Sequence, residues 1–170
     1  FFSSLDFYAE MVKRGISVVA IDLRNHGTSD GDESGLQYGR TESADALAAI
    51  AWAREHNPGK PVFAMGISMG GATVIHAAGK GASVDGWILL DPLLDTHSAV
   101  QRGSTVETGL PAWFFAPAAW AATTFHGLPS GGQQALSVAK SLTLPILLIQ
   151  DPDDPVTIID YADELARDNP

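Results

Sequence analysis

The stretch Gly66-Ile67-Ser68-Met69-Gly70-Gly71 decides the fold of this chain. An apolar run at 61–67 precedes it and a helical pattern at 69–78 follows it, so Ser68 alone is left to connect the two. Such an abrupt junction forces a strained backbone at the serine, and glycines at 66 and 70 leave room for the close approach. The pattern fits G-x-S-x-G, in which the hydroxyl projects above a sheet at the start of a helix. A plain Gly-Ser turn is the alternative.

On both sides of this junction, helices alternate with apolar strands. The run at 16–21 is rich in β-branched residues, which is typical of a strand covered on both faces, and 22–35 is a loop rich in Gly, Asp and Ser. Thr41 is predicted to cap the helix that follows. We expect strands at 16–21, 61–67, 84–90 and 145–150, and helices at 3–14, 41–56, 69–78 and 158–167. The alternation predicts a mostly parallel sheet flanked by helices.

Residues 93–143 are too many for a simple connection between two strands, and they are rich in aromatic side chains. We expect a small helical lid here, with Gly131-Gly132 at a turn. The aromatic side chains suggest a pocket for an apolar group, but they could equally bury the lid against the body. The aromatic residues are Trp113, Phe114, Phe115, Trp120 and Phe125, of which Trp113, Phe114 and Trp120 are the candidate pocket residues.

The composition of the 170 residues excludes several classes of function. With 45% apolar residues and a net charge of −10, the chain is an ordinary globular domain that would repel nucleic acid and anionic membranes. It has no cysteine, hence no disulfide or thiolate chemistry, and no spacing of metal ligands; we expect neither metal nor cofactor. No segment predicts a membrane span or a signal peptide. The compartment is left open, with the cytoplasm favoured, and the oligomeric state is not determined.

Three segments resemble the α/β-hydrolase superfamily, most closely its serine esterase and peptidase-like branch. They are Asp22-Leu23-Arg24-Asn25-His26-Gly27-Thr28-Ser29, the stretch 66–71, and Asp151-Pro152-Asp153-Asp154-Pro155-Val156. Relatives commonly carry Arg-Gly-His-Gly where this sequence has Arg-Asn-His-Gly. The resemblance implies one α/β-hydrolase-type domain with a lid insertion at about 93–143.

The resemblance also implies roles for individual residues. Ser68 would be the nucleophile, the amide of Met69 would hold the oxyanion, and Asp154 would be the acid of a catalytic triad. Asp153 is the second candidate for the acid, and an ordinary turn role for the Asp-Pro cluster stays open.

The base of the triad is the missing part. In the superfamily a histidine follows the acid, but none follows Asp154 in this sequence. His97 could approach the site because it comes soon after the third strand, and His26 resembles a structural loop histidine. The other histidines are His56, His76 and His126. We therefore expect an incomplete chain, without the N-terminal strands, without the C-terminal strand and helix, and with the catalytic histidine beyond its end.

The function predicted from these residues is that of a carboxylesterase-like serine hydrolase. It would cleave an ester, amide or thioester of a small, apolar acyl substrate through an acyl-enzyme on Ser68, and the 170 residues alone would be nearly inactive. The alternative is a non-catalytic binding or scaffold protein of the same fold. A histidine after one further strand would favour the enzyme.

Overall fold

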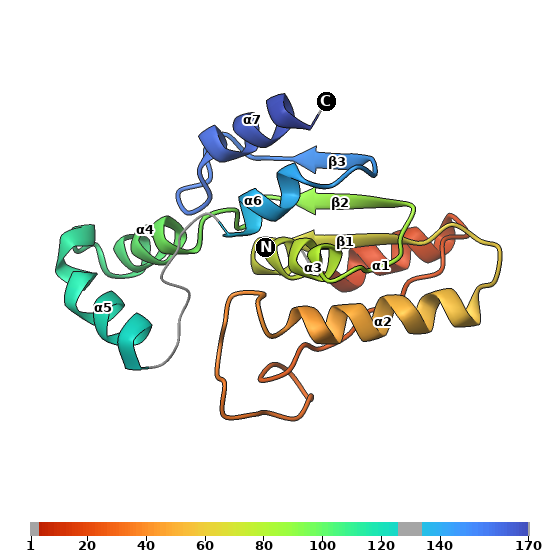
Figure 1. The fold of residues 1–170 in the computed structure, drawn as a ribbon, viewed down its shortest axis with the longest axis horizontal. Coiled ribbons are helices and arrows are strands. Elements are labelled where there is room, and N and C mark those ends of the chain that lie inside the picture. The colour runs from red at the N-terminus through yellow and green to blue at the C-terminus, as the bar shows by residue number, and fades with distance from the viewer. Residues whose placement is uncertain (1–3, 126–133, 170) are drawn as a thin grey trace.

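A computed structural model describes residues 4–125 and 134–169 of the chain (Figure 1). Its centre is a parallel sheet of β1 (Phe63–Ile67), β2 (Gly86–Leu90) and β3 (Ile146–Ile149), in the order β1-β2-β3. The α/β fold class and the parallel sheet predicted from the sequence are therefore confirmed, and three of the four expected strands form. The helices are α1 (Ser4–Lys13), α2 (Ser43–His56), α3 (Met69–Gly79), α4 (Thr96–Thr108), the 3₁₀ helix η1 (Ala112–Phe115), α5 (Ala116–Phe125), α6 (Gln134–Lys140) and α7 (Ile159–Asp168).

One face of the sheet forms the core. Alternate strand residues such as Trp87 and Leu89 are buried, and they belong to one cluster with Ile75 of α3, Leu136 of α6 and Leu165 of α7. Side chains of the opposite face are exposed or partly exposed. They include Phe63, Ile67, Leu147 and Ile149. The burial of the first face follows the two-residue period of a strand, so helix packing on that face holds the sheet.

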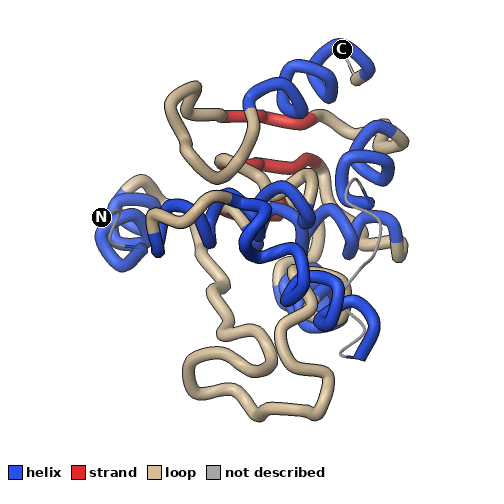
Figure 2. The backbone as a smooth tube through the Cα atoms, turned by 90° about the vertical axis from the view of Figure 1, so that its left-hand side faces the viewer, coloured by secondary structure: helices blue, strands red, loops and turns tan. Residues whose placement is uncertain are grey.

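The carboxyl ends of the three strands lie at the same edge. The strands run in one direction in Figure 1, toward the side where α4 and α5 lie. Figure 2 looks onto this side and shows the loop between α1 and α2 extending below the helices. Residues that directly follow each strand therefore gather at one edge, as in other open parallel sheets that bind ligands there.

The strand predicted at 16–21 is wrong. These residues form no strand, and Ile16, Val19 and Ile21 are 50%, 46% and 44% exposed. A β-branched run becomes a strand only where a neighbouring strand accepts and donates its backbone hydrogen bonds, and within the described residues none pairs with 16–21.

The predicted cap of α2 is also wrong. The helix begins at Ser43, and Glu42 before it already has helical backbone angles. The Thr41 hydroxyl donates to the Glu42 carboxylate at 3.2 Å instead of accepting from a helix amide. At the other end of the helix, the predicted stop is confirmed, because α2 ends at His56 and Asn57 is its C-cap.

Most of the described part of the insertion at 93–143 is helical. Helix η1 packs on α4 and α5, and these three elements extend away from the sheet (Figure 1). Helix α6, in contrast, packs on α3 and α7 and contributes Leu136 to the core. The turn expected at Gly131-Gly132 lies outside the described residues. The last part of the insertion therefore belongs structurally to the body of the domain.

Candidate active site

Ser68 has an unusual backbone conformation at the junction between β1 and α3. Its φ is 50° and its ψ is −116°, and it is the only residue between Ile67, which ends the strand, and Met69, which begins the helix. A non-glycine residue in such a region costs on the order of 1–3 kcal/mol and persists only where its surroundings impose it. Both main-chain groups of Ser68 are held, because its amide donates to the Leu90 carbonyl at 3.0 Å and its carbonyl accepts from the Leu93 amide at 3.0 Å.

Two glycines make this turn sterically possible. A Cβ on Gly66 would lie 2.2 Å from the Gly70 carbonyl oxygen, and a Cβ on Gly71 would lie 2.8 Å from Cβ of Pro92. A Cβ on Gly70 would meet no described atom within 4 Å. The prediction that Gly66 provides the room is confirmed, but the second glycine that the packing requires is Gly71 and not Gly70. The contact that requires it comes from the segment after β2, which sequence spacing did not indicate.

Met69 supplies the first amide of α3. The first four amides of an α-helix have no intrahelical acceptor, and the helix dipole adds partial positive charge at this end. The Met69 amide therefore lies at a helix terminus, directly after Ser68. An amide at a helix terminus is the kind of donor that can stabilise an anionic oxygen.

Asp154 lies in a tight turn after β3. Its Oδ1 accepts from the amides of Val156 at 2.7 Å and Thr157 at 2.9 Å, and its own amide donates to the Asp151 carbonyl at 3.2 Å. These contacts fix the carboxylate of Asp154, which is partly buried. Asp153, the second candidate for the triad acid, is exposed, and its amide donates to Oδ1 of Asp151 at 2.9 Å.

The sheet sets the separation between Ser68 and this turn. They follow β1 and β3, and these two strands flank β2, so the strands themselves lie about 9.6 Å apart. Ser68 comes one residue after β1, and Asp154 comes five residues after β3. Both residues thus follow strands that end at the same edge of the sheet, on the two sides of β2.

Four histidines lie in the described part of the chain, and none of them hydrogen-bonds to Ser68 there; His126 lies outside it. Burial, with a further contribution from Lys80, lowers the pKa of His76 on α3. The other three have partners elsewhere: His26 Nδ1 meets the Arg24 carbonyl at 2.8 Å, the His56 ring stacks on Trp52 with 4.0 Å between centroids, and His97 Nε2 accepts from the Gln101 amide at 2.9 Å.

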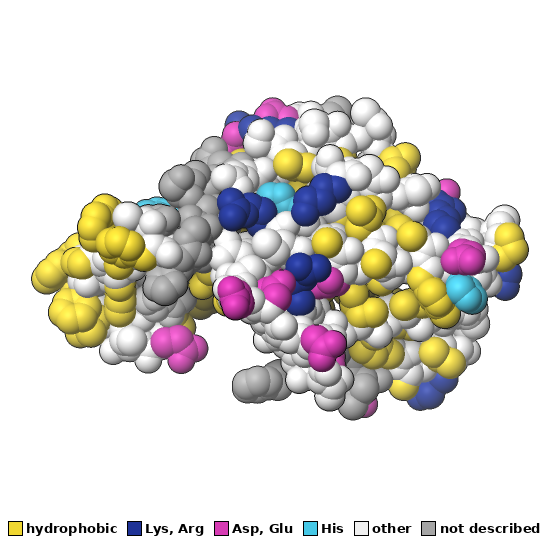
Figure 3. Space-filling model, turned by 60° about the horizontal axis from the view of Figure 1, so that its bottom comes forward, with side chains coloured by type: hydrophobic (Ala, Val, Ile, Leu, Met, Phe, Trp, Pro, Cys, Tyr) yellow, Lys and Arg dark blue, Asp and Glu magenta, His cyan; other side chains and the backbone are white. Residues whose placement is uncertain are grey.

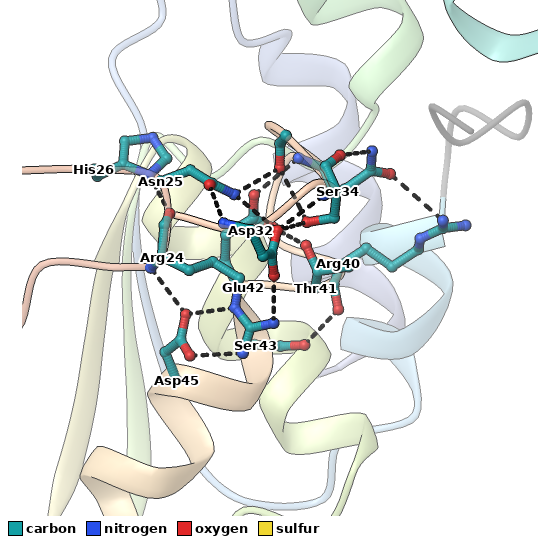
Figure 4. A network of polar contacts seen from close by, with 12 residues as sticks. Arg24, Asn25, His26, Asp32, Ser34, Arg40, Thr41, Glu42, Ser43 and Asp45 are labelled. Carbon is teal, nitrogen blue, oxygen red and sulfur yellow. Dashed lines mark hydrogen bonds and ion pairs between the residues drawn. The ribbon is translucent and has the colours of Figure 1, made fainter. Parts of the chain in front are cut away.

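The loop between α1 and α2 is tied down by an ionic network that the sequence did not reveal (Figure 4). The Arg24 guanidinium donates to both carboxylate oxygens of Asp45, at 2.9 and 2.7 Å, and to Asp32 at 3.2 Å. These bonds raise the pKa of Arg24 and lower that of Asp45. The Ser34 hydroxyl, bonded to Asp32, is the main reason why the pKa of Asp32 falls to about 2.

Glu42 fixes the end of this loop against α3. Its fully buried carboxylate accepts from the amides of Gln37 at 2.8 Å and Gly39 at 3.0 Å. Gly39 has a φ of 97°, and a Cβ there would lie 2.7 Å from the Thr73 nitrogen of α3. The loop is therefore packed directly on the helix that Ser68 precedes.

A small cavity lies between the segment after β2, the start of α4 and the segment before α7. Leu93, whose amide holds the Ser68 carbonyl, is part of its wall. Other wall residues are Pro92, Asp95, Ser98, Val156 and Tyr161. The cavity has a volume of only about 10 Å³, and its carboxylate and hydroxyl are bonded to each other, since Ser98 donates to Asp95 at 2.7 Å. It is therefore a small packing void and not a substrate pocket.

The aromatic residues predicted to line a pocket lie further out. Trp113 and Phe114 on η1 are 75% and 55% exposed, and Trp120 on α5 is 62% exposed. They contact other aromatic rings of the same segment, with 6.3 Å between the centroids of Trp113 and Phe114. Figure 3 shows hydrophobic side chains concentrated at this end of the molecule. In the described residues these rings are not part of the cavity wall, and their contact with a substrate stays a prediction.

A strained serine between a parallel strand and a helix, with an aspartate after a later strand, defines the α/β-hydrolase class. The model of one family of that class, described as serine aminopeptidase, S33, matches residues 4–120. The chain belongs to this family of α/β hydrolases, because the match covers more than half of its length.

Individual proteins are similar to this chain in sequence or in fold. It is 34% identical to rat monoglyceride lipase over 91 residues, which are 52% of this chain and 30% of that protein. An esterase from Pyrococcus furiosus has the same fold, with a TM-score of 0.72 and 24% identity, over 94% of this chain and 59% of the esterase. A monoacylglycerol lipase from Paleococcus ferrophilus has a TM-score of 0.60 with 20% identity, over 96% of this chain and 75% of that lipase. The chain thus spans less than two thirds of the rat protein and of the esterase. Of the helices described, none has both the length and the apolar character that a membrane crossing requires.

Proposed function

We propose that Ser68 is the nucleophile of a serine hydrolase that cleaves esters, or the related amides and thioesters, through an acyl-enzyme. The observation that carries the proposal is the backbone of Ser68, with φ 50° and ψ −116° at a junction of one residue between β1 and α3. A serine in a strained backbone conformation at the end of a strand is better suited to attack a carbonyl than to pack in the core. Strained residues of this kind cluster at active sites, where the strain is part of the mechanism.

The reaction takes place in two halves. The Ser68 oxygen attacks the carbonyl carbon while a base removes its proton, and the carbonyl oxygen becomes an anion beside the Met69 amide. The base then returns the proton to the leaving alcohol, amine or thiol, and the acyl group stays on Ser68. Water, activated by the same base, attacks the acyl-enzyme, and the acid product leaves with regeneration of the hydroxyl.

Asp154 is proposed as the residue that orients the base. Its Oδ1 is bound by two amides, so the carboxylate holds a fixed direction, as the acid of a triad requires. We propose that the base is a histidine contributed by residues outside this sequence, because none of the described histidines hydrogen-bonds to Ser68.

The substrate is proposed to be a small molecule with an apolar acyl or alcohol group. Two observations support this choice. The similar proteins include a monoglyceride lipase and an esterase, and the segment of η1 and α5 exposes Trp113, Phe114 and Trp120 on the side of the sheet where Ser68 lies. The net charge of −10 disfavours polyanionic substrates.

The test is hydrolysis of chromogenic esters by the full-length gene product that carries this chain. Ser68→Ala is expected to lower kcat by about 10⁶-fold and Asp154→Asn by at least about 10⁴-fold, as measured for other serine triads. Ser141→Ala is the matched control, because the Ser141 hydroxyl donates only to the Val138 carbonyl on a distant helix end. Binding of apolar ligands without turnover, unchanged by Ser68→Ala, would instead favour a scaffold or binding protein.

A second comparison tests where the base comes from. The 170-residue polypeptide alone is expected to turn over esters at only about 10³–10⁴ times the rate in water, because oxyanion and binding effects survive the loss of a triad member. Turnover at the rate of the full-length product would show that the base lies within these 170 residues.

A further inference from the structure

Asp91 lies between the two halves of the candidate site. It follows β2, the central strand, and thus separates Ser68 after β1 from the loop after β3. Its φ is 44°, a left-handed conformation that non-glycine residues seldom adopt and that Asp and Asn tolerate best. Asp91 and Ser68 thus both have a positive φ.

The backbone beside Asp91 is bound to the junction at Ser68. The Leu90 carbonyl accepts from the Ser68 amide at 3.0 Å, and the Leu93 amide donates to the Ser68 carbonyl at 3.0 Å. Pro92 lies so close to Gly71 that a Cβ there would meet it at 2.8 Å. Residues 90–93 therefore form a rigid wall against the serine.

The side chain of Asp91 extends in the other direction, to the loop at 151–154. Its Oδ1 accepts from the Asp151 amide at 2.6 Å, while its own amide donates to the Ile149 carbonyl at 2.8 Å. Asp151 in turn accepts from the next turn of the chain, through Oδ1 from the Asp153 amide at 2.9 Å and through its carbonyl from the Asp154 amide at 3.2 Å. The start of the turn that contains Asp154 is therefore fastened to the strand that also holds Ser68.

We propose that Asp91 is a positioning residue, whose carboxylate fixes the loop at 151–154 at the distance from Ser68 that lets Asp154 orient the base. The proposal rests on the proposed function. Asp91 itself contacts neither the nucleophile nor, in this role, the substrate. Without the Asp91 carboxylate, residue 91 would be joined to this segment only by the hydrogen bond from its own amide to the Ile149 carbonyl. The loop at 151–154 would then shift relative to Ser68.

The experiment compares three substitutions at position 91 in the full-length gene product. Asp91→Gly keeps the left-handed backbone but removes the acceptor, and Asp91→Ser shortens the side chain by one bond, so that its hydroxyl no longer reaches the Asp151 amide. Asp91→Asn keeps both the oxygen acceptor and the tolerance for positive φ. Asp30→Gly, in the exposed loop before α2, is the matched control for an Asp-to-Gly change.

For the Gly and Ser variants, kcat is expected to fall roughly 10- to 100-fold with little change in KM, since a displacement of about 1 Å in a catalytic group costs on that order. The acid limb of the kcat/KM profile is expected to move to lower pH, because a base histidine that loses its carboxylate partner protonates less readily. Asp91→Asn is expected to keep kcat within about fivefold, since a neutral acceptor makes a bond roughly half as strong as a charged one.

Three results would overturn the proposal. They are a folded Asp91→Gly variant with the parental kcat, a loss of kcat without movement of the acid limb, and failure of both Gly and Ser variants to fold while Asp91→Asn folds. The last two would assign Asp91 to the fold alone. Ser68→Ala and Asp154→Asn are assayed in parallel to test the proposed function separately. If these two variants keep activity, the proposed function itself is wrong; if they lose activity, the result concerns the role of Asp91 alone.

Discussion

The tightest contact at the serine junction predicts a large difference between two glycine-to-alanine changes four residues apart. In Gly66→Ala the new methyl group would lie 2.2 Å from the Gly70 carbonyl oxygen and 2.5 Å from the Gly71 nitrogen. Both are backbone atoms, so β1 and α3 must separate by at least about 1.2 Å for the 2.2 Å contact to reach an ordinary 3.4 Å. Forcing extra volume into a packed site costs typically about 1–3 kcal/mol.

Gly70→Ala is the matched control, because its Cβ meets no described atom within 4 Å and it lies in the first turn of α3. Alanine is the better helix former by up to about 1 kcal/mol, so this variant is expected to be as stable as the parent or more stable. The pair therefore isolates the steric requirement at position 66 from the general effect of removing a glycine.

The assay is thermal and urea unfolding of the full-length gene product, followed by circular dichroism. A loss of 1–3 kcal/mol lowers Tm by about 2–12 °C for Gly66→Ala, at about 2–4 °C per kcal/mol for a domain of this size. Equal Tm values for Gly66→Ala and Gly70→Ala would refute the claim that strand and helix meet at Gly66 without room for a side chain.

Two other predictions concern the loop before α2 and the exposed aromatic residues. Asp45→Asn should lower the free energy of unfolding by about 1–2 kcal/mol at neutral pH. This value lies between those for exposed ion pairs and for buried hydrogen bonds to charged groups. Because Arg24 lowers the pKa of Asp45 in the fold, the pair stabilises the protein above the unfolded value of 3.8 and loses this effect as pH falls through the lower folded value. Urea unfolding from pH 7 to pH 3 should thus show the variant and the parent converging in acid; a constant difference would contradict the pairing. Trp113→Ser should change stability by less than about 0.5 kcal/mol, since the ring is 75% exposed, but should lower kcat/KM for long-chain esters more than for acetate esters. Equal effects on both substrates would show that this ring does not contact the acyl chain.

Sequence patterns predicted the parts of the fold that depend on local chemistry. Continuous apolar runs predicted β1, β2 and β3, with each boundary correct to within two residues. The glycines around Ser68 predicted the junction between β1 and α3. These features depend on the period of the side chains and on backbone freedom, which are both properties of a few neighbouring residues. The same reasoning failed at 16–21, because a strand also requires a partner at a distance.

Contacts between distant segments account for the rest of what sequence reasoning missed. Thr41 does not cap α2, and the carboxylate of the next residue, Glu42, binds the loop amides. The need for a glycine at position 71 comes from Pro92, which is 21 residues further along the chain. The bond between Asp91 and Asp151 likewise joins residues 60 apart. Asp91 directly follows the strand expected at 84–90. A carboxylate directly after the central strand of a parallel sheet is the one signal that could have indicated its role.

The identity of the nucleophile is tested most directly by mapping the site of a fluorophosphonate adduct. The full-length gene product is expected to gain one adduct, on the peptide that contains Ser68, and the adduct should disappear in Ser68→Ala and remain in Ser141→Ala. An adduct on a different serine, or labelling that persists in Ser68→Ala, would show that the strained hydroxyl between β1 and α3 is not the group that attacks the substrate.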